Sequence, residues 1–254
     1  MVFNIIKHID PQMKRILSII CLLIMVAGST HAMAAAQEAG STSVKNTSPT
    51  FNIGFQGGYG RRLGKLPDTM SDYERTHAER LKNGLSLGVK LSAYMTPVIG
   101  VGFVLDNYHC SSTDYVLATF ENGTTAEGYN TDNIDILSVG PAIFIRHPSK
   151  DGKLMLTADC ALCFMYFSDK GVVVNQEGMI TGGNSGYIID IGVDYFLAPK
   201  ISVGLFANAA IGSIGRINVS NTTTGESQWI TLDDDSRESL THVGVGVSLT
   251  FHFK

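Results

Sequence analysis

The chain has 254 residues, of which 44% are hydrophobic and 17% charged, and its formal net charge at pH 7 is −4. Such a chain is too apolar to be intrinsically disordered, and its length suits one barrel-sized domain or two ordinary ones. Basic residues do not cluster with interleaved aromatic residues, so we exclude nucleic acid as a partner.

Residues 13–36 have the three-part build of a secretory signal peptide. Lys14 and Arg15 come first, an apolar run follows over residues 16–27, and Ala32-Met33-Ala34 gives a cleavage site. The alternative is a membrane anchor, but this run is shorter than the roughly 20 residues that a spanning helix needs. We therefore expect a signal peptide over residues 1–36 with its start at Met13, and a flexible linker over residues 37–49.

From residue 50 onward, apolar and polar residues alternate with the period of two that is typical of β-strands. Eight segments have this pattern, and each has at least the roughly 9–11 residues that a tilted strand needs to cross a bilayer. They are residues 51–60, 84–95, 98–108, 133–146, 154–167, 186–197, 200–213 and 240–253.

The connections between these segments are alternately short and long. Residues 96–97, 147–153 and 198–199 are short and contain proline or glycine, as tight turns do. Residues 61–83, 109–132, 168–185 and 214–239 are long and polar. Transmembrane barrels have this order because one set of connections faces the periplasm and the other faces the outside.

The two faces of each segment differ in a way that indicates a membrane barrel. In residues 84–95 one face is wholly apolar (Leu85, Leu87, Val89), whereas the other carries glycine and polar groups such as Lys90. A soluble barrel would need large apolar groups inside, but here the small and polar residues suit a narrow lumen and the apolar ones suit lipid. The sequence thus predicts an all-β fold, an eight-stranded antiparallel up-and-down transmembrane β-barrel.

The signal peptide, the eight strands, the alternating connections and the aromatic final strand together resemble the small outer-membrane barrels of Gram-negative bacteria, the OmpA/OmpX-like family. The resemblance covers residues 50–254 and implies an integral protein of the outer membrane. It also implies contact with the barrel assembly machinery, which would read the final strand through Phe251 and Phe253. The chain departs from the family in ending on Lys254 instead of an aromatic residue.

Charged side chains on the inner face predict a polar network in the lumen. Buried charges are costly unless they are paired, so we expect Lys90 and Arg146 to pair with Asp159, Asp190 and Asp194. The predicted lumen also contains Asp106, Asn208, His242 and His252. Because eight strands leave an interior just wide enough for side chains, we expect a plugged lumen, with a narrow pore for ions or small solutes as the alternative.

Three further sets of residues have polar chemistry outside the predicted lumen. Arg61, Arg62 and Lys65 begin the first long connection, where they could contact the phosphates of lipopolysaccharide. Residues 233–235 are three aspartates, which we interpret as a solvated loop tip because no calcium-loop glycine follows. Cys160 and Cys163 lie on opposite faces of one predicted strand, so we expect neither a redox pair nor a zinc site. We predict no cofactor and no metal.

An enzyme that modifies lipid A is the weakest of the alternatives. The two candidate motifs are His109-Cys110-Ser111, with Glu121 as a carboxylate, and His147-Pro148-Ser149. A Ser-His pair also needs a carboxylate within hydrogen-bond reach, which a sequence cannot locate. We therefore predict no catalytic residues, and expect a structural or surface-interaction role in which the barrel anchors polar loops. The sequence indicates neither the extracellular ligand nor the oligomeric state.

Overall fold

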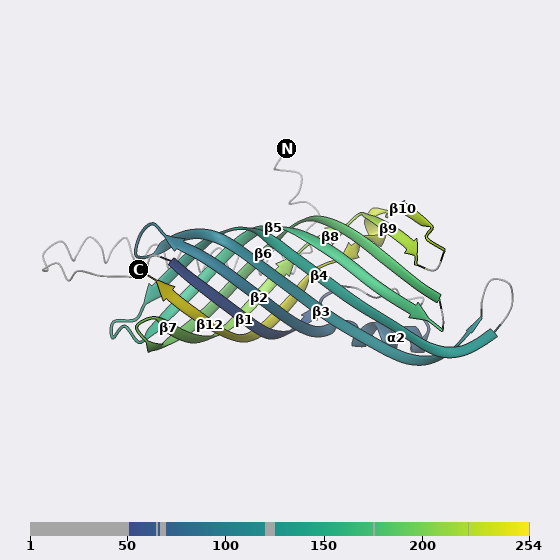
Figure 1. The fold of residues 1–254 in the computed structure, drawn as a ribbon, viewed down its shortest axis with the longest axis horizontal. Coiled ribbons are helices and arrows are strands. Elements are labelled where there is room, and N and C mark those ends of the chain that lie inside the picture. Colours follow the sequence, from purple (N-terminus) through teal and green to yellow (C-terminus); the bar gives the residue numbers. More distant parts are fainter. Residues whose placement is uncertain are drawn as a thin grey trace, which may run out of the picture. The chain divides into compact units, whose positions relative to one another are not determined.

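The computed structural model describes residues 51–253 apart from 65, 67–69, 120–124, 175 and 223. The expected signal peptide and linker lie outside the described residues. Eight long strands form the fold, and they match the eight predicted segments in number and order (Figure 1). They are β1 (Phe51–Arg62), β2 (Asn83–Tyr94), β3 (Ile99–Thr119), β4 (Thr125–Pro148), β5 (Leu154–Val173), β6 (Gln176–Ala198), β7 (Ile201–Ile211) and β12 (His242–Phe253).

The eight strands close into an antiparallel ring. Each strand pairs with the next, and β12 pairs with both β7 and β1. A ladder followed around the ring from Phe51 returns to β1 at Arg61, ten residues further along the strand. This stagger tilts the strands against the barrel axis. The predicted eight-stranded up-and-down barrel is confirmed.

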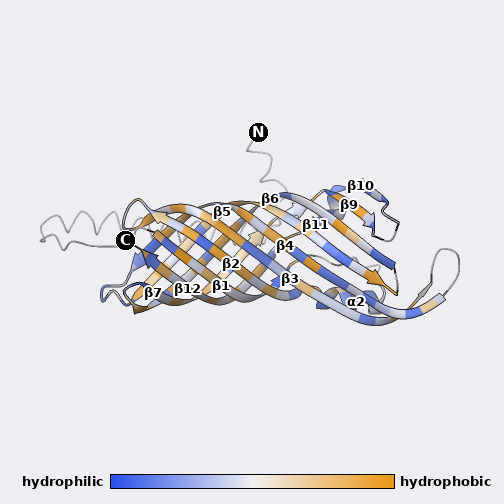
Figure 2. Ribbon diagram, in the orientation of Figure 1, coloured by the Kyte–Doolittle hydropathy of each residue, from blue (hydrophilic) through white to orange (hydrophobic). Residues whose placement is uncertain are grey.

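The outer surface of the barrel is an apolar belt. Leu85 and Leu87 of β2 are 62% and 66% exposed, whereas Ser86 between them is buried in the lumen. The same alternation runs through the other barrel strands, and Figure 2 shows hydrophobic residues recurring along them. The belt includes Phe55, Tyr59, Phe103, Leu105, Val139, Ile143, Leu156, Leu162, Phe164, Ile191, Leu205, Val245 and Val247. Within the described residues, a closed ring with this surface presents no open sheet edge to lipid.

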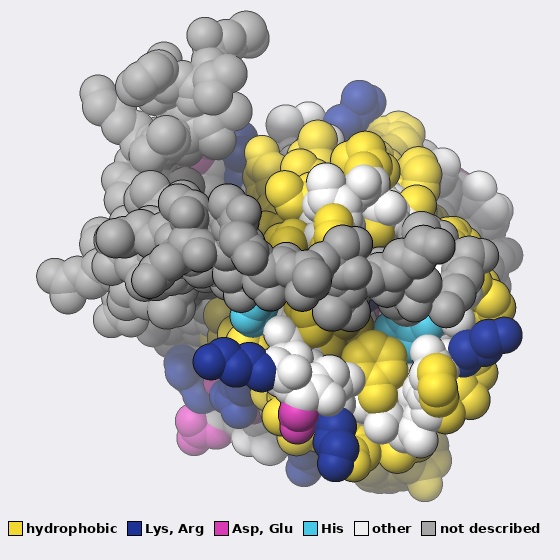
Figure 3. Space-filling model, turned by 90° about the vertical axis from the view of Figure 1, so that its left-hand side faces the viewer, with side chains coloured by type: hydrophobic (Ala, Val, Ile, Leu, Met, Phe, Trp, Pro, Cys, Tyr) yellow, Lys and Arg dark blue, Asp and Glu magenta, His cyan; other side chains and the backbone are white. Residues whose placement is uncertain are grey.

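The two ends of the barrel differ. At one end, the turn end, three short connections join β2 to β3, β4 to β5 and β6 to β7. Exposed Lys150, Lys153 and Lys200 lie in or beside these turns, and basic side chains are visible at the rim in Figure 3. At the opposite end, the loop end, the long connections meet.

At the loop end the strands continue well past the apolar belt. Residues 109–119 and 125–132, expected as a loop, form the upper halves of β3 and β4, and residues 168–173 and 176–185 extend β5 and β6. Two more strands extend this sheet, since β9 (Arg216–Asn221) pairs with β6 and β10 (Ser227–Thr231) pairs with β9. We name these upper parts of β3–β6, with β9 and β10, the raised sheet. The expectation of loops was wrong here because threonine, tyrosine and valine favour strands even at exposed positions.

One helix, α2 (Asp72–Arg80), lies in the first long connection, which the sequence analysis described only as long and polar. Ser71 caps it, since its hydroxyl accepts from the Glu74 amide and the Glu74 carboxylate accepts from the Ser71 amide. This reciprocal pair is a capping box. Among the described residues no helix has the length and apolar character to cross a membrane. The short elements β8 (Ser213–Ile214), η2 (Asp234–Ser236) and β11 (Glu238–Ser239) complete the last connection.

Candidate functional site

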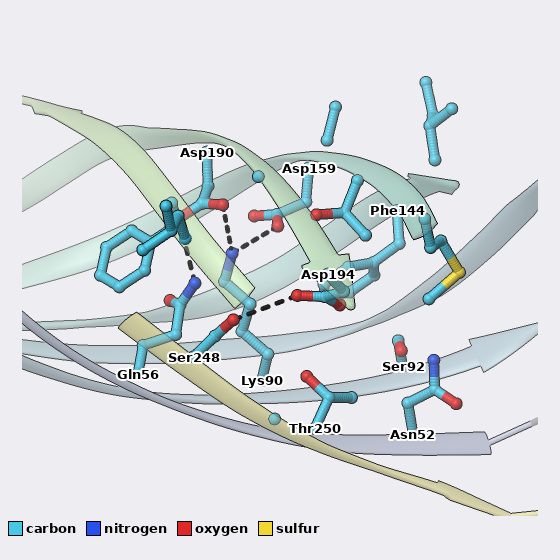
Figure 4. A pocket seen from close by; sticks show the side chains of 18 of the residues that line it. Asn52, Gln56, Lys90, Ser92, Phe144, Asp159, Asp190, Asp194, Ser248 and Thr250 are labelled. Atoms are coloured by element: carbon cyan, nitrogen blue, oxygen red, sulfur yellow. Dashed lines mark hydrogen bonds and ion pairs between the residues drawn. The ribbon is translucent and has the colours of Figure 1, made fainter. Parts of the chain in front are cut away.

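The middle of the lumen is crossed by an ion-pair cluster centred on Lys90. Its ammonium lies 2.5 Å from Asp159 Oδ2 and 2.9 Å from Asp190 Oδ1. Gln56 donates to the second oxygen of Asp190 at 3.2 Å (Figure 4). These side chains come from β2, β5, β6 and β1, so the cluster ties opposite walls of the barrel together. Both carboxylates and the ammonium are removed from solvent, which makes their pairing necessary.

Beside this cluster lies a small polar cavity. Asp194 borders it and accepts a hydrogen bond from Ser248 at 3.1 Å (Figure 4). The cavity measures about 50 Å³, which is room for a few water molecules. The lumen at this level is therefore filled by side chains, with small wet gaps between them.

The other predicted lumen residues are distributed along the barrel and do not join this cluster. At the turn end, Arg146 donates to the Pro97 carbonyl at 2.9 Å and stacks 3.7 Å above the Tyr94 ring. His252 lies between Ser202 and Asn52, at 2.9 and 3.1 Å. Nearer the loop end, His242 stacks on Tyr108 and faces Asp106 at 3.7 Å, which is an electrostatic contact and not a hydrogen bond.

The mouth of the barrel at the loop end contains α2, held by His77. Its Nδ1 lies 2.7 Å from Asp114 of β3 and its Nε2 lies 2.7 Å from Asp132 of β4. Each ring nitrogen therefore faces one carboxylate, and the ring bridges β3 and β4. Arg80 also binds Asp114, and the bond from His77 holds the pKa of that carboxyl below its usual range. The helix is thus fastened to the raised sheet by charge.

Asp169 of β5 lies in the same mouth without an ion pair among the described residues. Burial, and to a smaller extent the nearby Asp132, raise its pKa to about 7, while Arg62 opposes the shift. Arg62 itself binds Glu238 and the Ser239 carbonyl. Asp169 is therefore a group whose charge is costly in the folded protein near neutral pH.

The three residues predicted to contact lipopolysaccharide separate in the structure. Arg62 is buried and points inward to Glu238, so its expected outward contact is wrong. Arg61 points outward at the rim of the apolar belt and pairs with Glu79 of α2 at 3.0 Å. Lys65 lies outside the described residues. A shallow groove beside Arg61 is lined by Arg75, Thr76, Glu79, Arg80 and Asn83.

His109 and Ser111 lie on the outer face of β3, just beyond the apolar belt. His109 Nδ1 contacts Asp135 of β4 at 2.9 Å, a partner that the sequence did not reveal. Glu121, the expected carboxylate, falls outside the described part of the chain. In the second motif, the Ser149 hydroxyl donates to Asp151 and accepts from the Leu154 amide, so it stabilises a turn.

The remaining predicted motifs are the aspartates of residues 233–235 and the pair Cys160 and Cys163. Asp233 precedes η2, and Asp234 pairs with Arg237 at 2.7 Å. Cys163 is buried while Cys160 lies on the outer face, as their spacing predicts. Within the residues that the structure describes, no group of three or more His, Cys, Asp and Glu side chains is arranged so that it could hold a metal ion.

The sequence reasoning missed the groups at the mouth because they depend on α2. Only the spacing Ser71-x-x-Glu74 signals this helix, through its capping box. Nothing in the sequence indicates that His77 meets Asp114 and Asp132, since these are 37 and 55 residues away.

No protein-family model matches the chain, and no match to a curated protein was found. Among solved structures, Neisserial surface protein A is similar over 80% of this chain and 97% of its own, with 9% identity and a TM-score of 0.47. A major outer membrane protein from Thermus thermophilus gives 80% and 99% coverage, 12% identity and a TM-score of 0.48. OprG from Pseudomonas aeruginosa gives 81% and 98% coverage, 8% identity and a TM-score of 0.45. With TM-scores this low, these likenesses say nothing about ligand or activity.

The barrel's own surface determines its class. A closed antiparallel ring of eight strands with an apolar belt outside, a polar lumen, short turns at one end and long connections at the other is built to cross a membrane. The chain is an integral β-barrel protein of the outer membrane.

Proposed function

We propose that this protein is a structural and surface-interaction protein, in which a plugged barrel anchors the raised sheet outside the cell. The raised sheet is the observation that supports this role. Its strands continue as a hydrogen-bonded ladder to Thr119 and Thr125, far beyond the belt. A barrel whose only task was to conduct would not need this extension.

The raised sheet exposes aromatic side chains that a partner could bind. Tyr115, Leu117 and Tyr129 are 60%, 65% and 62% exposed, and the two tyrosine rings contact edge to face at 5.5 Å. Trp229 of β10 is also exposed and stacks under Arg216. Aromatic residues and arginine are enriched in protein interfaces because they bury a large area with few rotatable bonds.

Attachment of cells tests this role. Cells that display the wild-type protein should attach to surfaces coated with a panel of glycans and extracellular proteins. Replacing Tyr115, Leu117 and Tyr129 by serine should remove that attachment, whereas Lys153→Ser at the turn end should preserve it. Equal attachment by all three proteins would contradict the proposal.

Conductance in planar bilayers tests the plug. Because the Lys90 cluster crosses the lumen and the cavity beside it holds only a few waters, we expect no stable conductance steps from the wild type. The double variant Asp159→Asn, Asp190→Asn removes both partners of Lys90 and should allow intermittent ion flow. Stable, reproducible steps from the wild type would favour the narrow pore instead.

The contact between His109 and Asp135 favours a second candidate function, hydrolysis of an outer-leaflet lipid ester. Ser111 lies two residues along the same face of β3, about 6.6 Å from His109 along the strand. In this candidate His109, oriented by Asp135, takes the proton of the Ser111 hydroxyl as the serine oxygen attacks the ester carbonyl. The ester C–O bond then breaks, and the alcohol leaves with the proton that His109 returns, which leaves the acyl group on Ser111. Water then releases the fatty acid and restores the serine.

The neighbouring serine supplies a matched control for the second candidate. Ser112 is buried and faces the mouth, whereas Ser111 faces outward. If the candidate is correct, Ser111→Ala and His109→Ala should raise the number of acyl chains on the membrane lipids measured by mass spectrometry, and Ser112→Ala should not. Unchanged lipids in every variant would remove the enzyme from consideration.

A further inference from the structure

A groove at the loop end of the barrel gathers arginines from two elements. Arg61 comes from the end of β1, while Arg75 and Arg80 come from α2. The space between them measures about 520 Å³ and is open to solvent on one side. His77 and Arg80 both bind Asp114, so this side of the helix is fastened to the mouth, while Arg75 lies on the exposed side toward the groove.

The charges in and around this groove do not balance. The basic groups are Arg61, Arg75, Arg80 and Lys82, and the acidic groups in contact with them are Glu79 and Asp114. Glu79 lies 3.0 Å from Arg61 and 2.8 Å from Lys82, and the bond from Lys82 holds the pKa of Glu79 below its usual range. Among these contacting groups two positive charges are in excess, while Asp72 and Glu74 of the same helix lie outside the lining of the groove.

Arg75 distinguishes a binding groove from a purely structural arrangement. The Arg61–Glu79 pair fastens α2 to β1, and the Arg80–Asp114 pair fastens it to β3. Arg75, by contrast, makes no ion pair within the described residues, although it lines the groove. Its guanidinium has five donors that suit the oxygens of a phosphate.

The height of the groove on the barrel indicates the source of the anion. Arg61 follows Tyr59 by two residues on the outer face of β1, and Asn83 precedes Leu85 by two on β2. Tyr59 and Leu85 belong to the apolar belt. A step of two residues along a strand is about 6.6 Å, so the groove begins within one headgroup layer of the hydrocarbon.

We propose that this arginine groove binds the phosphate of a phosphorylated glycolipid in the outer leaflet. Arg61 and Arg75 donate to the phosphate oxygens, and Asn83, which donates one amide N–H to the Glu79 carbonyl at 3.3 Å, offers the other to the sugar. Glu79 competes with the phosphate for Arg61. The acyl chains of the same lipid lie along the apolar belt below, over Tyr59 and Leu85. This inference goes beyond the raised sheet and holds whichever of the two candidate functions is correct.

The test measures lipid binding to the full barrel refolded in detergent micelles, for example by native mass spectrometry. The probe is bisphosphorylated lipid A, compared with the same lipid after enzymatic removal of its phosphates and with inorganic phosphate. The variants are Arg61→Gln with Arg75→Gln, Glu79→Gln alone, and Arg237→Gln as a control. Arg237 is an exposed arginine of the last long connection, outside the groove. A heat-modifiability gel confirms that each variant is folded.

The wild type should bind the phosphorylated lipid about tenfold more tightly than the dephosphorylated lipid, as two charge-assisted bonds at an exposed site allow. The double arginine variant should lose this difference, Glu79→Gln should increase it, and Arg237→Gln should leave it unchanged. Equal affinity for both lipids, or an equal loss in Arg237→Gln, would overturn the proposal. Binding of inorganic phosphate as tightly as lipid A would overturn the assignment to a lipid.

Discussion

Lys90 is a single residue on which the packing of the lumen depends. Its ammonium compensates Asp159 and Asp190, two carboxylates that would otherwise face each other across the β5–β6 pair. Replacing Lys90 by methionine keeps most of the length of the side chain but leaves both carboxylates unpaired. We expect the free energy of unfolding in urea to fall by about 3–5 kcal/mol, the usual effect of breaking a buried pair.

The control for this change is Lys170→Met, which alters an exposed lysine of β5. This substitution should change the free energy of unfolding by less than about 0.5 kcal/mol. If both variants lose the same stability, the ion pairs of Lys90 do not hold the lumen together.

Asp169 should make the raised sheet more stable as the pH falls. Its pKa in the folded protein, about 7, lies above the value of roughly 3.9 expected in an unfolded chain. The folded state therefore binds the proton more tightly, and stability rises as pH falls from above 7 toward 4. The charged neighbours are Asp132, Arg62, Glu238 and His77.

Hydrogen exchange over residues 168–182, corrected for the intrinsic rate, measures this effect. Protection in the wild type should be greater at pH 5 than at pH 8. Asp169→Asn should flatten the dependence. A wild type that becomes less protected at pH 5 would show the opposite sign and contradict the prediction.

At the scale of the element, α2 depends on its capping box more than on its own apolar surface. Its nine residues include one buried side chain, His77. Ser71→Ala removes the bond to the Glu74 amide and should destabilise the docked helix by about 1 kcal/mol. Exchange of the amides of residues 75–80 should then be about fivefold faster. Ser71→Thr keeps the hydroxyl and should therefore show the protection of the wild type. Fast exchange in this variant as well would show that the capping hydrogen bond does not stabilise α2.

The predicted elements agree with the structure where lipid imposes a strict pattern. In β12, the residues Val243, Val245 and Val247 face outward, and Gly246 lies so close to β1 that an added Cβ would fall 2.3 Å from the Gly57 carbonyl oxygen. Such alternation follows from a narrow ring in hydrocarbon and can be recognised in one sequence. The upper half of β3 was not predicted because both of its faces contact water or polar groups, which removes the apolar signal.

Contacts across the mouth could not be predicted at all. The pairing of Lys90 with Asp159 and Asp190 was predictable because all three side chains face the same lumen. The directions of Arg61, which points outward, and Arg62, which points inward, depend instead on their positions in β1. Partners such as Glu79 and Glu238 come from connections whose path cannot be derived from the sequence.

For the whole molecule, the raised sheet and the barrel should be separable. Replacing residues 113–131 by a short glycine-serine turn removes the tip of the β3–β4 hairpin but leaves the ladder below it intact. Because the apolar belt ends before this tip, we expect the shortened protein to insert into the membrane and to keep its mobility shift on boiling. Its thermal midpoint should fall by only a few degrees, which corresponds to a loss of about 1 kcal/mol in the free energy of unfolding. Loss of the folded band would show that the tip is needed for folding.

The pairing of β1 with β12 governs the time order of biogenesis. His252 contacts Asn52, so the two ends of the described barrel are brought together across 200 positions of the chain. Closing so long a loop is slow, because the chain loses conformational entropy before the contacts between β1 and β12 form and stabilise it. Until β12 pairs with them, β1 and β7 each have an open edge whose backbone N–H and C=O groups cannot form hydrogen bonds with lipid. We therefore expect the nascent chain to need a temporary strand-like partner at those edges, and a chain that stops before His242 to be degraded before it can insert.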